Sequence, residues 1–99
     1  MSIAVDFNTE QSEVTLFVEG RFDFSCHQEF REAYSKHEAK QFVIDMSKTE
    51  YIDSSALGML LLLREYSGSG DKCITLVGCN EAVRKILALS SFDKMFEIK

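Results

Sequence analysis

The apolar residues of this chain change their spacing several times, from every second position to every third or fourth. Period-two spacing is typical of half-buried strands, because successive side chains of a strand point to opposite faces. Two such runs open the chain: Ile3, Val5 and Phe7, and then Val14, Leu16 and Val18. The short polar segment between them predicts an antiparallel hairpin, and Gly20 ends the second run.

Three later segments have helical spacing, and each follows a residue suited to cap a helix. Ser25 followed by Gln28 resembles a capping box, in which the two side chains satisfy N–H groups of the first turn. The triplet Asp53-Ser54-Ser55 and the single residue Asn80 are the other two start signals. The expected helices cover about residues 26–39, about residues 53–66, and a segment that begins at Asn80.

Three short apolar runs complete the pattern and are predicted to be strands. They are Phe42-Val43-Ile44, ending at Asp45-Met46, then Cys73 to Val77, and finally Met95 to Ile98. The predicted order is ββαβαβαβ. Alternation of strands and helices implies parallel pairing with right-handed crossovers. We therefore expect one small α/β domain over residues 1–99, with a mixed β-sheet and helices mainly on one face.

Composition excludes several classes of protein. The formal net charge is −5, so a nucleic-acid partner is not expected. The longest apolar run, Met59 to Leu63, is too short to insert into a membrane, and the first residues do not resemble a signal peptide. Cys26, Cys73 and Cys79 lack metal-site spacing, as do the two histidines, so no metal site and a reduced, cytoplasmic environment are expected.

The segment from Asp45 to Gly58 is the most specific part of the sequence. Its second half, Ile52 to Gly58, is Ile-Asp-Ser-Ser-Ala-Leu-Gly. This resembles the signature of STAS domains, especially the standalone anti-sigma factor antagonists, in which Gly usually stands at the position of Ala56. Weaker matches to the same family lie at Gly20 to Asp23, Gly78 to Asn80 and Leu89 to Phe92.

The resemblance implies a STAS-type fold and a phosphorylation switch. By analogy Ser54 is the phosphorylated residue, with Ser55 as a secondary candidate. The implied partners are an anti-sigma factor with serine kinase activity, which binds the unphosphorylated form and thereby releases a sigma factor, and a serine phosphatase. The partner-binding residues expected from the resemblance are Asp23, Asp53, Ser54, Ser55, Ala56, Leu57 and Met59.

Elementary electrostatics supports Ser54 independently. A helix N-terminus offers unpaired N–H groups and about half a positive charge, so a phosphate is tolerated there. The phosphate adds about −1.5 to −2 charge beside Asp53. We therefore expect phosphorylation to weaken partner binding and not to unfold the domain.

Other interpretations stay open from the residues alone. Asp53, Ser54 and Ser55 can be only a helix cap, and Asp23 can be a solvated loop carboxylate. Most of the apolar residues from Leu57 to Leu63 are expected in the core, with Met59 or Leu62 exposed for a partner. A catalytic role for Ser54 is not favoured, because no Gly-x-Ser-x-Gly elbow surrounds it and no cofactor-binding loop is present. The alternative function is a STAS accessory subunit of a lipid-transport ABC system or of a sensory assembly.

Overall fold

A single five-stranded sheet organises the chain. The structure, a computed structural model, describes residues 2–36, 39–67 and 74–99. The sheet order is β1-β2-β3-β4-β5; β1 and β2 are antiparallel, and each later pair of neighbours is parallel. The strands are β1 Ser2–Asn8, β2 Glu13–Phe22, β3 Gln41–Ile52, β4 Ile74–Val77 and β5 Glu97–Ile98. The predicted mixed sheet and ββαβαβαβ order are confirmed.

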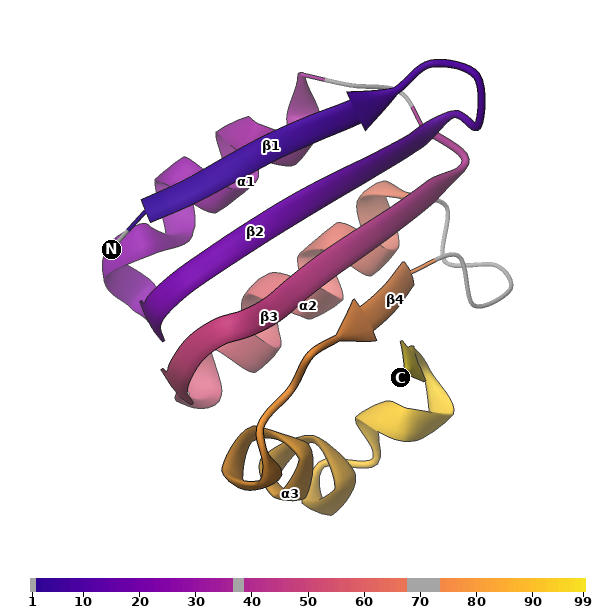
Figure 1. Ribbon diagram of the computed structural model, residues 1–99. Helices are drawn as coiled ribbons and strands as arrows, with labels where there is room; N and C mark the ends of the chain where they lie inside the picture. The colour runs from indigo at the N-terminus through magenta and orange to yellow at the C-terminus, as the bar shows by residue number, and fades with distance from the viewer. Residues whose placement is uncertain (1, 37–38, 68–73) are drawn as a thin grey trace.

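Two helices cover one face of this sheet. α1 and α2 lie behind β1, β2 and β3 in Figure 1, while α3 lies below β4 in the same view. The helices are α1 His27–Ser35, α2 Ser54–Tyr66 and α3 Glu81–Leu89, with short 3-10 turns at Phe24–Cys26 and Phe92–Lys94. Within the described residues no helix covers the front of the three long strands in this view.

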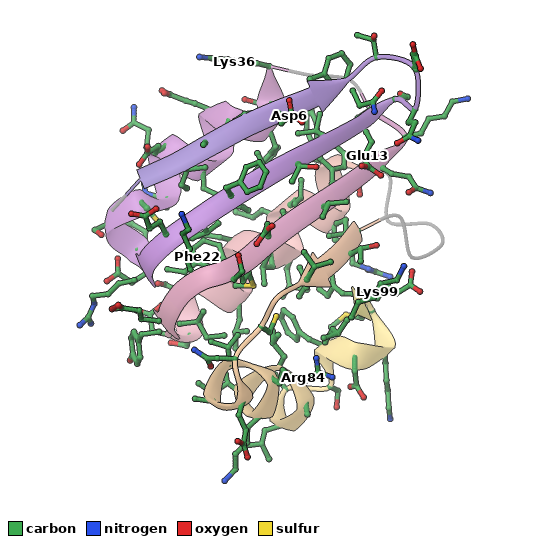
Figure 2. The ribbon with its side chains drawn as sticks, viewed as in Figure 1. Asp6, Glu13, Phe22, Lys36, Arg84 and Lys99 are labelled. Carbon is green, nitrogen blue, oxygen red and sulfur yellow. The ribbon has the colours of Figure 1, made fainter. Side chains whose placement is uncertain are left out.

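The core lies between the sheet and its helices. The period-two run of β2 supplies part of it, because every second residue of β2 and β3 points toward the helices. The run of β1 contributes less than expected, since Val5 and Phe7 are 39% and 37% exposed. The fully or almost fully buried side chains are Val14, Leu16 and Val18 from β2, Phe42, Ile44 and Met46 from β3, Phe30 from α1, and Leu60 and Leu63 from α2. Phe22, labelled in Figure 2, closes this core at the end of β2 and is 0% exposed.

β3 is longer than predicted. The sequence ended this strand at Asp45-Met46, but it continues to Ile52 beside β2. Two register shifts place six steps of β3 opposite four steps of β2, from the pair Phe17–Asp45 to the pair Arg21–Tyr51. Such bulges interrupt the apolar alternation, so the polar residues that follow Met46 resembled a loop in the sequence.

The same irregularity corrects the prediction for Gly20. This residue does not end β2, because the strand continues to Phe22. Gly20 has φ +86° and lies at the second register shift, where a residue without a side chain adopts a left-handed backbone at no steric cost. Thr49, on the bulged part of β3, is 3% exposed and donates its hydroxyl to the carbonyl of Val18 at 2.7 Å.

The first helix also begins and ends differently. Asp23 rather than Ser25 is the capping residue, because its carboxylate accepts the N–H of Ser25. The chain then forms a 3-10 turn before α1 begins at His27, and the helix ends at Ser35. The predicted capping box is therefore wrong: Gln28 bonds instead to Glu32, one turn further along the helix.

The other start signals are confirmed. Asp53 is the N-cap of α2, which ends at Tyr66 as predicted, and Asn80 caps α3 by accepting the N–H of Val83 at 2.8 Å. The last strand is confirmed but shorter than predicted, Glu97–Ile98. The predictions for Cys73 and for His37, one of the two histidines without metal-site spacing, lie outside the described residues.

Candidate functional site

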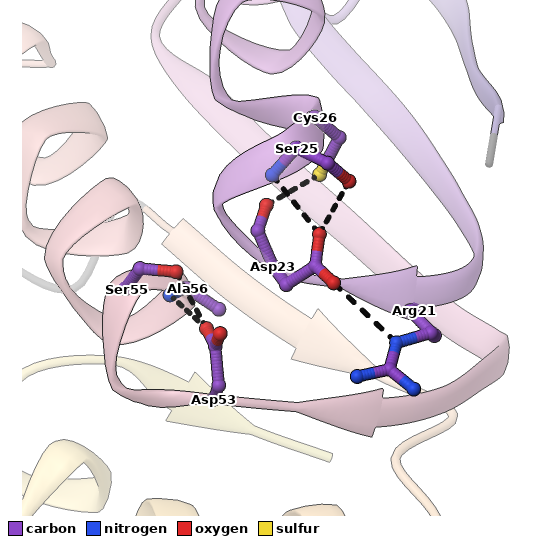
Figure 3. Close-up of polar contacts among 7 residues, drawn as sticks. All are labelled: Arg21, Asp23, Ser25, Cys26, Asp53, Ser55 and Ala56. Atoms are coloured by element: carbon purple, nitrogen blue, oxygen red, sulfur yellow. Dashed lines mark hydrogen bonds and ion pairs between the residues drawn. The ribbon is translucent and has the colours of Figure 1, made fainter.

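The candidate site lies where β2 and β3 end. Phe22 and Ile52, the last residues of these strands, are register partners in the parallel pair. Asp23 and Asp53 follow them directly, so two aspartates leave the sheet at the same edge. Figure 3 shows the two carboxylates with their hydrogen-bond partners. Each aspartate has extended backbone and caps the helical turn that follows it.

Asp53 fixes the start of α2. One carboxylate oxygen, Oδ1, accepts the N–H of Ala56 at 3.1 Å and the hydroxyl of Ser55 at 2.6 Å. The backbone carbonyl of Asp53 accepts the N–H groups of Ala56 and Leu57. These bonds satisfy donors that the first turn of a helix otherwise leaves unpaired.

The two serines after Asp53 have different environments. The hydroxyl of Ser55 is half-buried and is held by Asp53. Ser54, the first residue of α2, is exposed, and its side chain makes no hydrogen bond to any described residue. The backbone N–H groups of Ser54 and Ser55 donate to no described residue either. Ser54 therefore combines an accessible hydroxyl with free N–H donors beside it.

Asp23 repeats the arrangement of Asp53 on the neighbouring strand. Its Oδ1 accepts both the N–H of Ser25, at 3.0 Å, and the Ser25 hydroxyl. The hydrogen bonds from Ser25 are the main reason that the pKa of Asp23 is lowered, and Arg21 adds to them. Nε of Arg21 lies 3.4 Å from Oδ2 of Asp23.

Two exposed aromatic residues flank the aspartates. Phe24, next to Asp23, is 64% exposed and stacks on His27 with 4.4 Å between ring centroids. Tyr51, two residues before Asp53, is 45% exposed. The guanidinium of Arg21 lies over its ring, 4.8 Å from the ring centroid, in a cation–π contact. The sequence did not single out Arg21, Phe24 or Tyr51 as site residues. The sequence signal that was available is an aromatic residue close to each aspartate: Phe24 next to Asp23, and Tyr51 two residues before Asp53.

Not every residue expected at the partner surface reaches it. Asp23, Asp53, Ser55 and Leu57 are half-buried, and Ser54 is exposed. Ala56 is 0% exposed because the first turn of α2 packs it against the core, so its side chain cannot face a partner as expected.

Met59 also differs from the expectation. Its side chain is 6% exposed, because it packs into the core and lines the groove between α1 and α2. Leu62, the other residue expected to be exposed, is 54% exposed, and Leu61 beside it is 39% exposed. The outward face of α2 therefore runs from Ser54 through Gly58 to these two leucines, at helical spacing.

Across residues 2–36, 39–67 and 74–99, no three His, Cys, Asp or Glu side chains are grouped so that they could hold a metal ion. In the same part of the chain, no helix has the length and apolar character needed to cross a membrane.

The fold and the site together define a class of protein: a small α/β domain in which a capped helix begins at the edge of the sheet. A family model described as "Mlab, STAS domain" matches residues 5–97. The chain belongs to the STAS-domain family. A STAS-domain containing protein of Pseudomonas aeruginosa, strain UCBPP-PA14, is 44% identical over 100 residues, which are 99% of each chain.

Solved structures share the fold at low sequence identity. The anti-sigma factor antagonist SpoIIAA in its unphosphorylated form superposes with a TM-score of 0.76 at 15% identity, over 99% of this chain and 87% of that one. An anti-sigma factor antagonist from Mycobacterium paratuberculosis gives a TM-score of 0.72 at 22% identity, over 98% of this chain and 85% of that one. The predicted STAS-type fold is confirmed.

Proposed function

We propose that this chain is a phosphorylation-switched binding protein of the cytoplasm. When Ser54 is unphosphorylated, it binds an anti-sigma factor that has serine kinase activity, and a sigma factor is released. Phosphorylation of Ser54 by that partner ends the binding, and a serine phosphatase restores it. In this proposal the chain itself catalyses nothing and needs no cofactor.

The observation that carries the proposal is the environment of Ser54. It is an exposed hydroxyl with no hydrogen-bond partner among the described residues, at the first position of α2. Ser55 is a poorer acceptor, because its hydroxyl is half-buried and donates to Asp53 at 2.6 Å. Phosphoryl transfer from ATP would form an Oγ–P bond on Ser54 and release ADP and the hydroxyl proton.

The fold is suited to accept this modification without unfolding. The free N–H groups of the first turn and the positive end of the helix dipole favour an anion at Ser54. The modification instead weakens partner binding at this surface, because about −1.5 to −2 charge is added next to Asp53 and close to Asp23. Similarity to the fold of anti-sigma factor antagonists supports a partner of that kind.

Peptide mapping of the chain isolated from its native host tests the proposal. We expect a fraction of molecules to carry one phosphoryl group, located on Ser54. Two matched variants control the assignment: Ser54→Ala should carry none, whereas Ser55→Ala should still carry it. A chain that is unmodified under all growth conditions, or modified only on Ser55, would contradict the proposal.

A second candidate function is supported by the name of the matching family model, "Mlab, STAS domain", which is not the name of an anti-sigma factor antagonist. In this alternative the chain is a STAS accessory subunit, of a lipid-transport ABC system or of a sensory assembly, and the same helix start binds an ATPase or scaffold without phosphorylation. Affinity purification from the host distinguishes the two functions: the first predicts a kinase that modifies Ser54, and the second a stable complex in which Ser54 is unmodified.

A further inference from the structure

Arg21 is a basic side chain placed at the same end of the sheet as Ser54. Its guanidinium lies 4.8 Å from the ring centroid of Tyr51, and its Nε is 3.4 Å from a carboxylate oxygen of Asp23. The side chain is 68% exposed, and its two Nη groups donate no hydrogen bond to the described residues. Arg21 therefore uses only its Nε–H in a contact with Asp23, and the N–H donors of its two Nη groups are available to a ligand.

The strand register sets how far Arg21 is from Ser54. Arg21 and Tyr51 are register partners, and Ser54 follows Tyr51 by three residues. With strands about 4.8 Å apart and a rise of about 3.3 Å per residue, the two backbone positions are about 11 Å apart in the plane of the sheet. An extended arginine and a phosphoserine side chain together span such a distance. In the view of Figure 3 the carboxylate of Asp23 lies between the guanidinium of Arg21 and Asp53.

The ion pair between Asp23 and Arg21 is weak enough for a phosphate to replace Asp23 as the partner of Arg21. Asp23 already accepts two hydrogen bonds from Ser25, and these contribute more to its lowered pKa than Arg21 does. The contact with Arg21 is long at 3.4 Å and exposed, and such ion pairs contribute little. A phosphate dianion offers a guanidinium two parallel charge-assisted hydrogen bonds, which are much stronger.

We propose that Arg21 binds the phosphate of phosphorylated Ser54. To do so, its guanidinium gives up its contact with Asp23. The inference rests on the proposed function only in taking Ser54 as the modified residue. Phosphorylation then changes the surface twice, because it adds an anion at α2 and withdraws the cation that lies over Tyr51. Arg21 is a positioning residue for the phosphate, and the exposed face of Tyr51 changes with it.

A titration of the phosphate tests this binding without any kinase. Phosphoserine is incorporated at position 54 by genetic encoding, and the phosphate is titrated by ³¹P NMR. A bound guanidinium stabilises the dianion, so Arg21→Gln should raise the second pKa of the phosphate by about half a unit or more, about threefold in the dissociation constant. Arg21→Lys should restore part of the difference, because it keeps the charge without the bidentate geometry.

Arg64→Gln is the matched control, because Arg64 lies in the last turn of α2, far from Ser54. It should titrate as the unsubstituted phosphorylated chain does. Equal pKa values for the Arg21→Gln and Arg64→Gln phosphoproteins would overturn the inference and leave the proposed function untouched. Conversely, absence of phosphate on Ser54 in the host would contradict the proposed function while this titration still reports on Arg21.

Discussion

Phe22 on β2 and Ile52 on β3 are register partners, and each is followed by an aspartate that caps the next helical turn. The two aspartates use the same hydrogen bonds. Asp23 accepts the hydroxyl of Ser25, and Asp53 accepts that of Ser55, in both cases two residues further along the chain. Parallel strands thus bring two capping carboxylates to one edge of the sheet. Ser54 is the nearby hydroxyl that this pattern leaves unused.

Loss of the Asp53 cap should destabilise the domain. Asp53→Ala removes the acceptor for the N–H of Ala56 and for the hydroxyl of Ser55, and we predict a loss of about 0.5–2 kcal/mol in the free energy of unfolding. Urea denaturation followed by circular dichroism measures it. Asp53→Asn should lose less, because asparagine caps about as well, whereas Glu10→Ala in an exposed turn should stay within about 0.5 kcal/mol. Equal losses for Asp53→Ala and Glu10→Ala would contradict the cap.

The lowered pKa of Asp23 should depend on Ser25. The folded-state pKa is below the ordinary value of 3.8, so the contribution of Asp23 to stability is present above that value and is lost as the pH falls through the folded pKa. Ser25→Ala removes the hydroxyl donor and should raise the pKa of Asp23 toward its ordinary value. NMR titration of the side-chain carboxyl measures this directly. A pKa unchanged by Ser25→Ala would show that another group stabilises the carboxylate.

Two glycines should respond in opposite ways to alanine. An added Cβ at Gly58, inside α2, meets nothing within 4 Å, so Gly58→Ala should stabilise the domain by up to about 1 kcal/mol. Gly78 has φ +74°, and a Cβ there would lie 2.8 Å from Cβ of Ser47 and 2.9 Å from its backbone. Gly78→Ala should therefore lower the melting temperature, whereas Gly58→Ala should raise it. A change of the same sign in both variants would contradict these local environments.

The fold was predictable because its signals are local. The period-two runs identified β1 and β2, a short apolar run identified the first part of β3, and the polar triplet at 53–55 identified the start of α2. The second half of β3 was missed, because two bulges shift its register and leave polar residues where an apolar alternation was expected. Thr49, for example, is buried in that segment, since its hydroxyl bonds to the carbonyl of Val18.

The site was only partly predictable for a different reason. Ser54 and Asp53 belong to one continuous segment, so their spacing carried the signal. Arg21 and Tyr51 are 30 positions apart in the sequence and meet only because the bulged register pairs them, which no local pattern specifies. Met59 was misplaced because exposure along an apolar helix depends on the neighbouring helix. Both Met59 and Leu62 line the groove between α1 and α2, but Met59 is 6% exposed and Leu62 is 54% exposed.

Partner binding should respond to charge at Ser54 rather than to its size. We predict that Ser54→Asp lowers affinity for the proposed anti-sigma factor partner at least about tenfold, about 1.4 kcal/mol, because a carboxylate beside Asp53 must be desolvated in the contact. Ser54→Asn has nearly the same shape without the charge and is the matched control; it should bind more tightly than Ser54→Asp. Ser54→Ala should bind and resist phosphorylation. Isothermal titration calorimetry gives the affinities, and thermal melts check that all three variants are folded. Equal affinities of the Asp and Asn variants would show that the surface at Ser54 is not electrostatically controlled.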